Sequence, residues 1–144
     1  MADIIQEFPV KAPQERVFEM FSLPKGLDAW WTKTSSGEPR EGSDYALHFG
    51  PGYDWRARVA RCKPGWAFEL LMTQAHEDWQ NTRVGCELTP DAGHATRVRF
   101  YHIGWPQQNE HWRVSCHCWA MYLRLLRRHL EFGESVPFEK RLEA

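Results

Sequence analysis

The sequence lacks any apolar run close to the roughly twenty residues that a bilayer-spanning helix needs. It also lacks the basic start and apolar stretch of a secretory signal, since its first residues include the acidic Asp3 and Glu7. The sequence therefore has neither of the usual signals for membrane insertion or for export. We therefore expect a soluble cytoplasmic protein without a membrane span.

No sign of charge prevails, because the formal net charge is −1 and the arginines are scattered between acidic residues. A nucleic-acid-binding surface needs a basic stripe, so nucleic acid is not an expected partner. Gly/Ser-rich or Pro-rich tracts are also missing, and apolar residues make up 42% of the chain. This composition predicts a single globular domain over residues 1–144, without a linker.

The spacing of a small disulfide-bonded scaffold is missing from the four cysteines. We expect them to be free. The string Cys116-His117-Cys118 resembles a metal motif, but helical residues one and two positions apart point in different directions. These side chains cannot converge on one ion, and we expect no metal and no cofactor here.

The first third of the chain predicts a strand and a pair of helices. Residues 4–10 read as a strand, and Pro13 stands near the first turn of a helix. The string 23–26 breaks that helix, and a second short helix is expected over residues 27–31. The polar residues 34–43 have the composition of a hairpin connection.

From residue 45 onward, apolar and polar residues alternate in runs separated by short turns. Tyr45, Trp55, Phe68, Val84 and Val98 each stand at or near the start of one such run. Consecutive runs joined by turns predict an antiparallel meander with one apolar face, and that face needs a cover.

The cover is predicted by a helical stripe near the C-terminus, in which apolar residues recur at spacings of four and three. The stripe contains Trp112, Cys116, Trp119, Leu123, Leu126 and Leu130, and Gly133 follows where a helix is expected to end. The remaining tail is expected to pack back loosely. The predicted fold is therefore α+β: a curved antiparallel sheet wrapped around a long C-terminal helix, with two short helices after the first strand and an internal cavity.

Several local strings resemble bacterial START-like domains, the helix-grip or SRPBCC superfamily. They are Leu27-Asp28-Ala29-Trp30-Trp31-Thr32, Phe49-Gly50-Pro51, Gly104-Trp105, the segment 118–126 and Leu130-Glu131-Phe132-Gly133-Glu134. The likeness covers nearly the whole chain. Within the superfamily the sequence is similar to the C-terminal domain of the activator of heat shock protein 90 ATPase. The resemblance implies the fold and a cavity. Chaperone interaction is a weaker expectation, because the separate amino-terminal domain of the eukaryotic activators is not found here.

Eight tryptophans are many for a chain of this length, and most fall near predicted element ends or on the covered face. Aromatic walls with an occasional indole N–H are typical of small-molecule sites. We therefore predict a protein that binds a small hydrophobic or aromatic molecule under the long helix, with His102 orienting the ligand. The candidate ligand-binding residues are Trp30, Trp31, Trp55, Phe68, Met72, Phe100, His102, Trp105, Trp112, Cys116, Trp119 and Leu123.

The sequence leaves alternatives open. A cyclase, dehydratase or hydrolase in the same cavity would need an ionisable side chain facing it, for which Glu110, Asp54 and the string His76-Glu77-Asp78 are candidates. A zinc site at His102, Glu110 and His111 matches no familiar motif. A sheet face with Arg56, Arg58, Arg97 and Arg99 is a candidate docking surface for an acidic partner such as a chaperone. An exposed sheet edge or helix stripe is a candidate surface for a homodimer.

Overall fold

The computed structural model describes residues 2–144 and contains one seven-stranded antiparallel sheet in the order β1-β7-β6-β5-β4-β3-β2. The strands are β1 (Ala2–Val10), β2 (Thr34–Ser36), β3 (Asp44–His48), β4 (Asp54–Lys63), β5 (Ala67–Gln74), β6 (Arg83–Pro90) and β7 (Thr96–Trp105). The helices are α1 (Gln14–Ser22), α2 (Pro24–Trp30) and α3 (Glu110–Phe132), with two 3-10 turns, η1 (Ala92–His94) and η2 (Phe138–Glu143).

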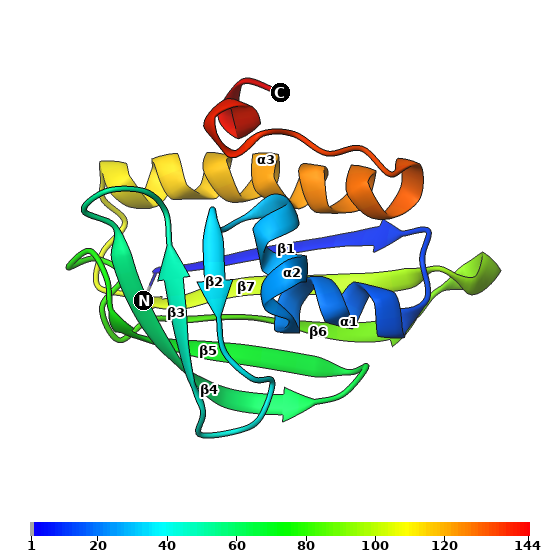
Figure 1. Cartoon of the computed structure of the whole chain (residues 1–144), viewed down its shortest axis with the longest axis horizontal. Coiled ribbons are helices and arrows are strands. Elements are labelled where there is room, and N and C mark those ends of the chain that lie inside the picture. The colour runs from blue at the N-terminus through cyan, green and yellow to red at the C-terminus, as the bar shows by residue number, and fades with distance from the viewer. Residues whose placement is uncertain (1) are drawn as a thin grey trace.

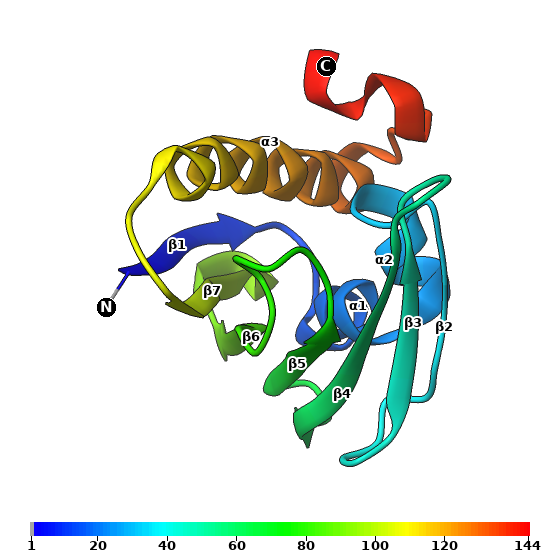
Figure 2. The same ribbon diagram turned by 90° about the vertical axis from the view of Figure 1, so that its left-hand side faces the viewer.

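The sheet curves from β1 round to β2, and the helices occupy its concave side (Figure 2). Short helices α1 and α2 lie inside the curve, and α3 lies across the open side (Figure 1). The 3-10 turn η2 packs on the outer side of α3. This arrangement confirms the predicted helix-grip fold, in which the C-terminal helix covers the apolar face of the sheet.

The corner between α1 and α2 depends on two residues. Pro24 is the first residue of α2, where its missing N–H is no loss because that group has no partner inside the helix. Gly26 lies against the backbone of α1, so closely that a Cβ atom there would collide with the carbonyl oxygen of Glu19. The string 23–26 thus ends one helix and starts the next, whereas the sequence predicted a start at residue 27.

The long helix α3 begins and ends with specific caps. The Asn109 side chain accepts a hydrogen bond from the backbone N–H of Trp112 (2.9 Å), and Gly133 adopts a left-handed conformation at the C-terminus. Trp119, Leu123 and Leu126 face the sheet and are at most 2% exposed. The predicted stripe therefore forms the contact between helix and sheet.

The C-terminal tail is anchored rather than loose. The guanidinium of Arg141 donates to the carbonyl oxygens of Asp28 (2.6 Å), Thr32 (3.0 Å) and Val136 (3.2 Å). Its side chain is only 6% exposed, and this burial lowers its pKa. The tail thereby binds to the end of α2 and fixes η2 on α3, contrary to the prediction of loose packing.

Within residues 2–144, no helix is long and apolar enough to cross a membrane. The short edge strand β2 lies inside the polar segment that the sequence predicted as a hairpin connection, and it pairs with β3. All four cysteines are free thiols.

Candidate functional site

An apolar pocket of about 450 Å³ opens at one edge of the interface between α3 and the sheet. Its walls come from the end of α2, the hairpin of β3 and β4, the β5–β6 loop, one side of α3, and η2. The lining residues are Trp31, Phe49, Tyr53, Trp55, Trp79, His111, Val114, Ser115, Cys118, Tyr122, Phe138 and Leu142. The volume falls within the range of small-molecule sites.

Exposed apolar side chains surround the mouth of this pocket. Tyr53 is 56% exposed, and Val114 and Leu142 are each 50% exposed. Each comes from a different element, so the apolar surface is assembled by the fold and not by one stretch of sequence. Exposed apolar surface that continues into a hollow is typical of a binding site.

Indole rings form the wall of the pocket and the core behind it. Trp79 stacks on Trp119 with ring centroids 5.6 Å apart, and it contacts Trp55 at 5.0 Å. Trp31 lies 5.3 Å from Trp119 and 5.4 Å from Phe49. These contacts hold the pocket wall rigid, because each ring is packed on several others.

One wall residue has an unused hydrogen-bond donor. Trp79 is 8% exposed, and its Nε1 is buried without a hydrogen-bond partner among residues 2–144. A buried donor without an acceptor costs about 1–3 kcal/mol. In contrast, the indole N–H of Trp30 donates to the carbonyl oxygen of Met20 over 2.8 Å.

His102 lies in the core at the centre of a hydrogen-bond chain. The indole N–H of Trp119 donates to His102 Nδ1 over 3.1 Å. The other ring nitrogen must therefore carry the proton, and Nε2–H donates to Thr82 Oγ1 over 2.8 Å. The Thr82 hydroxyl in turn donates to the carbonyl oxygen of Trp79 over 2.6 Å.

This environment keeps His102 neutral. The side chain has no exposed surface, and burial lowers its pKa to about 3, with a smaller contribution from the charge of His111. Both ring nitrogens are bonded to protein groups, so neither is available to orient a ligand. His102 therefore ties α3, β7 and the β5–β6 loop together and does not line the pocket.

The structure divides the predicted ligand-binding residues into two groups. Trp31 and Trp55 line the apolar pocket. The others lie in the core or pack against it: Trp30, Phe68, Met72, Phe100, His102, Trp105, Trp112, Cys116, Trp119 and Leu123. Their side chains fill the space under α3. Trp30 and Phe68 border an internal hollow of only about 10 Å³, at most enough for one water.

Polar side chains gather at the pocket rim, where the β5–β6 loop meets the start of α3. Nδ1 of His111 lies 2.9 Å from Asp78 Oδ2, and Asn109 Nδ2 donates to the same oxygen over 3.3 Å. These hydrogen bonds lower the pKa of Asp78. The His76 ring packs edge-on against the His111 ring at 4.6 Å. His102 is bonded elsewhere, so it does not join Glu110 and His111 in a metal site.

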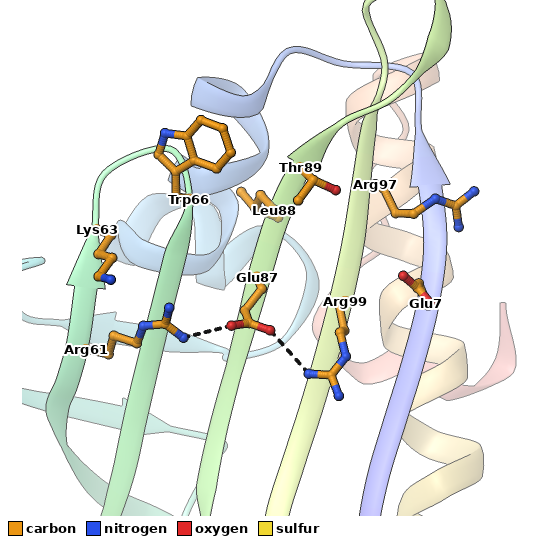
Figure 3. A pocket seen from close by; sticks show the side chains of 9 residues that line it. All are labelled: Glu7, Arg61, Lys63, Trp66, Glu87, Leu88, Thr89, Arg97 and Arg99. Atoms are coloured by element: carbon orange, nitrogen blue, oxygen red, sulfur yellow. Dashed lines mark hydrogen bonds and ion pairs between the residues drawn. The ribbon is translucent and has the colours of Figure 1, made fainter.

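The outer face of the sheet has a second hollow, of about 460 Å³ and a different character (Figure 3). Glu87 lies at its centre and pairs with Arg61 (2.9 Å) and Arg99 (3.2 Å). The other lining residues are Glu7, Lys63, Trp66, Leu88, Thr89 and Arg97. Charged pairs across neighbouring strands, rather than apolar walls, define this surface.

Each arginine of the predicted docking surface has an acidic neighbour. Arg56 lies 3.3 Å from Asp54, Arg58 lies 3.4 Å from Asp44, and Arg97 lies 3.6 Å from Asp91. Arg99 pairs with Glu87 as described. Each of the four arginines is therefore paired, but Arg99 shares Glu87 with Arg61, so the pairs reduce the positive charge of the outer face without cancelling it.

Most of the pocket wall on α3 was not predicted from the sequence. His111, Ser115, Cys118 and Tyr122 recur at spacings of four, three and four, beside the core stripe. That spacing was available as a signal, but the polar character of these side chains hid it. Phe138 and Leu142 of η2 carried no periodic signal at all.

The comparisons with known proteins agree with this architecture. The fold defines the chain as an α+β protein of the helix-grip class. The sequence profile of the Activator of Hsp90 ATPase homolog 1-like protein family matches residues 11–131, and the chain belongs to this family. A comparison with curated proteins found no match.

Several solved structures are similar to this chain. The solution structure of the Aha1 dimer from Colwellia psychrerythraea has a TM-score of 0.83 and 26% identity, covering 94% of this chain and 100% of that one. CalU16 from Micromonospora echinospora has a TM-score of 0.74 and 19% identity, covering 98% and 81%. DynU16, a putative protein in the dynemicin biosynthetic locus, has a TM-score of 0.77 and 20% identity, covering 95% and 51%. The last two likenesses show the fold.

Proposed function

We propose that this protein binds a small hydrophobic or aromatic molecule in the apolar pocket at the edge of α3. The observation that carries the proposal is the joining of that pocket to exposed apolar side chains at its mouth, which include Tyr53 and Val114. A protein gains nothing in stability by leaving such surface in contact with water. A ligand that covers this apolar surface would remove it from water, and that area would then contribute to the free energy of binding.

The wall chemistry narrows the ligand class. Trp31, Trp55 and Phe49 offer flat aromatic surface, which favours a ligand with at least one ring. Tyr122 adds a phenol, and burial raises its pKa, so it stays a hydrogen-bond donor at neutral pH. The ligand is therefore expected to be largely apolar, with an oxygen acceptor for this hydroxyl.

A fluorescence titration tests this proposal with anilinonaphthalene sulfonate, an aromatic probe whose emission rises in apolar surroundings. Binding in the pocket should also quench tryptophan emission, because three wall residues are indoles. The diagnostic variant is Val114→Asp, which adds a negative charge at an exposed position of the mouth. Phe132→Asp is the matched control, since Phe132 is exposed on the same helix and does not line the pocket.

We expect Val114→Asp to weaken probe affinity at least tenfold and Phe132→Asp to leave it nearly unchanged, because a carboxylate covered by the probe would lose solvation and repel the sulfonate. Equal affinities of the two variants would contradict the proposal.

A second candidate function is proton-transfer catalysis on a ligand in the same pocket, which one observation favours. His111 lines the pocket, and its Nδ1 faces the Asp78 carboxylate at 2.9 Å. If Nδ1 carries the proton, Nε2 is left as a base. Turnover of a bound molecule by the wild type, and its loss in His111→Phe with binding retained, would support an enzyme over a carrier.

Fewer observations support an association of this protein with a second copy of itself or with a chaperone. The Colwellia psychrerythraea relative is described as an Aha1 dimer, and the edge strand β1 of this chain carries Ile5 at 51% exposure. We propose a homodimer through this edge. Light scattering should give twice the chain mass for the wild type and a lower mass for Ile5→Lys; a monomeric wild type would contradict it. Chaperone binding stays a prediction of the family resemblance.

A further inference from the structure

Three potential metal ligands meet at the pocket rim, and of the predicted trio only His111 is among them. One nitrogen of His76, one nitrogen of His111 and one carboxylate oxygen of Asp78 all lie within 4.8 Å of one another. Asp78 Oδ2 is 2.9 Å from Nδ1 of His111 and 4.0 Å from Nδ1 of His76. We propose that these side chains bind a divalent transition-metal ion, with Zn²⁺ as the expected occupant.

The distances are close to those of a real site. Ligand atoms about 2.0–2.2 Å from a tetrahedral zinc ion lie roughly 3.3 Å from one another. The two measured separations fall on either side of that value. The His76 side chain is 50% exposed, so a small rotation brings it in without disturbing the core. Asp78 and His111 would exchange their mutual hydrogen bond for bonds to the ion, and Nδ1 of His76 would give up the hydrogen bond that it accepts from the Asp78 backbone N–H over 3.1 Å.

The ligand types select the kind of ion. Imidazole nitrogen suits zinc and other transition metals, whereas magnesium and calcium prefer oxygen ligands throughout. Two imidazoles and one carboxylate leave at least one coordination position for water or a ligand oxygen. Cys118 lies in the same pocket wall, but burial raises the pKa of its thiol and disfavours the thiolate that would bind the ion.

The surrounding structure orients the set. Asn109 caps α3 through its Oδ1 and donates from Nδ2 to Asp78 Oδ2, so a helix start holds the carboxylate in place. The His111 ring packs against Trp105 with centroids 5.3 Å apart. Supporting contacts of this kind fix the ligands of protein metal sites. An ion here would link the β5–β6 loop to α3 beside the pocket mouth.

This inference does not depend on the proposed apolar ligand, since zinc can bind whether or not the pocket is used. If His111 binds the ion through Nδ1, its single ring proton moves to Nε2, which then no longer offers a lone pair as a base. The same nitrogen cannot then keep its hydrogen bond to Asp78 as a catalytic pair. Metal binding and the acid–base role of His111 are therefore alternatives for this group.

The test is a zinc titration of the chelator-treated full chain by calorimetry, followed by the absorption spectrum of the Co²⁺ form. The variants are His76→Ala and Asp78→Asn. His117→Ala is the control, because His117 is an exposed histidine on α3 outside the cluster. The exposed position of His76 makes a folding defect in His76→Ala easy to exclude by circular dichroism.

We expect one Zn²⁺ per chain, at least a tenfold loss of affinity in both cluster variants, and unchanged affinity in His117→Ala. The cobalt spectrum should show visible d–d bands without a thiolate charge-transfer band. Absence of zinc binding, equal affinity of His76→Ala and His117→Ala, or a thiolate band would each overturn the proposal. The thiolate band would place the ion at the cysteines instead.

Discussion

Trp119 on α3 donates its indole N–H to Nδ1 of His102 on β7 across 3.1 Å, in the centre of the core. This bond fixes the position of the long helix over the sheet and selects the neutral form of the imidazole. It also explains why a histidine can occupy a core position without a counter-ion, since both of its nitrogens are paired.

The neutral His102 should make stability fall with acidification. Its pKa in the folded protein is about 3, whereas in the unfolded chain it is near 6.5. Between these values the unfolded state binds one more proton, so the free energy of unfolding falls by up to about 1.4 kcal/mol for each pH unit lost. The full contribution is present only above about pH 6.5.

Urea denaturation between about pH 7 and pH 5 checks this, because most carboxylates stay ionised in that window. The variant His102→Gln keeps an acceptor for Trp119 and a donor for Thr82 but cannot titrate. The slope of its unfolding free energy against pH should be smaller than that of the wild type by the equivalent of up to one proton, about 1.4 kcal/mol per pH unit. The same slope in both proteins would show that His102 is not the group responsible.

Gly26→Ala should destabilise the protein although alanine is the better helix former. The added Cβ would collide with the carbonyl oxygen of Glu19 and lie 2.6 Å from Cα of Met20. Overpacking of this kind costs about 1–3 kcal/mol, more than the roughly 1 kcal/mol gained in helix propensity. Thermal unfolding should show a lower Tm than in Lys25→Ala, an exposed change in the same turn. A raised Tm would mean that α1 and α2 are not closely packed.

Arg141→Met should release the C-terminal tail. The carbonyl oxygens of Asp28 and Thr32 would lose their donor, at a cost of about 1–3 kcal/mol. Probe affinity should fall as well, because η2 supplies Phe138 and Leu142 to the pocket wall. Urea denaturation and the fluorescence titration measure the two effects. Arg124→Met, on the exposed side of α3, should change neither the stability nor the probe affinity. If Arg141→Met also left both quantities unchanged, the anchoring role of Arg141 would be refuted.

The fold was predictable because its signals are periodic. Alternation in the strands and the stripe from Trp112 to Leu130 follow directly from the faces that each element buries. The edge strand β2 was missed because three polar residues carry no alternation against a core. The anchoring of the tail was also beyond the sequence, since Arg141 bonds to backbone carbonyls, which any residue can offer.

The site was harder to predict than the fold, for a physical reason. An aromatic residue that lines a pocket and one that fills the core are chosen by the same apolar contacts, so Trp55 and Trp105 look alike in sequence. Only the packing shows that the first lines a pocket and the second is buried. The rim histidines were recognised one by one, but their meeting depends on how the β5–β6 loop approaches α3.

The apolar pocket, and not the outer face, is expected to receive the ligand. The most direct test is the two-dimensional ¹⁵N–¹H NMR spectrum of the tryptophan indoles during titration with anilinonaphthalene sulfonate. The signals of Trp31, Trp55 and Trp79 should shift with one common affinity, while that of Trp66 on the outer face should stay in place. A shift of Trp66 with the three pocket indoles unmoved would contradict this expectation.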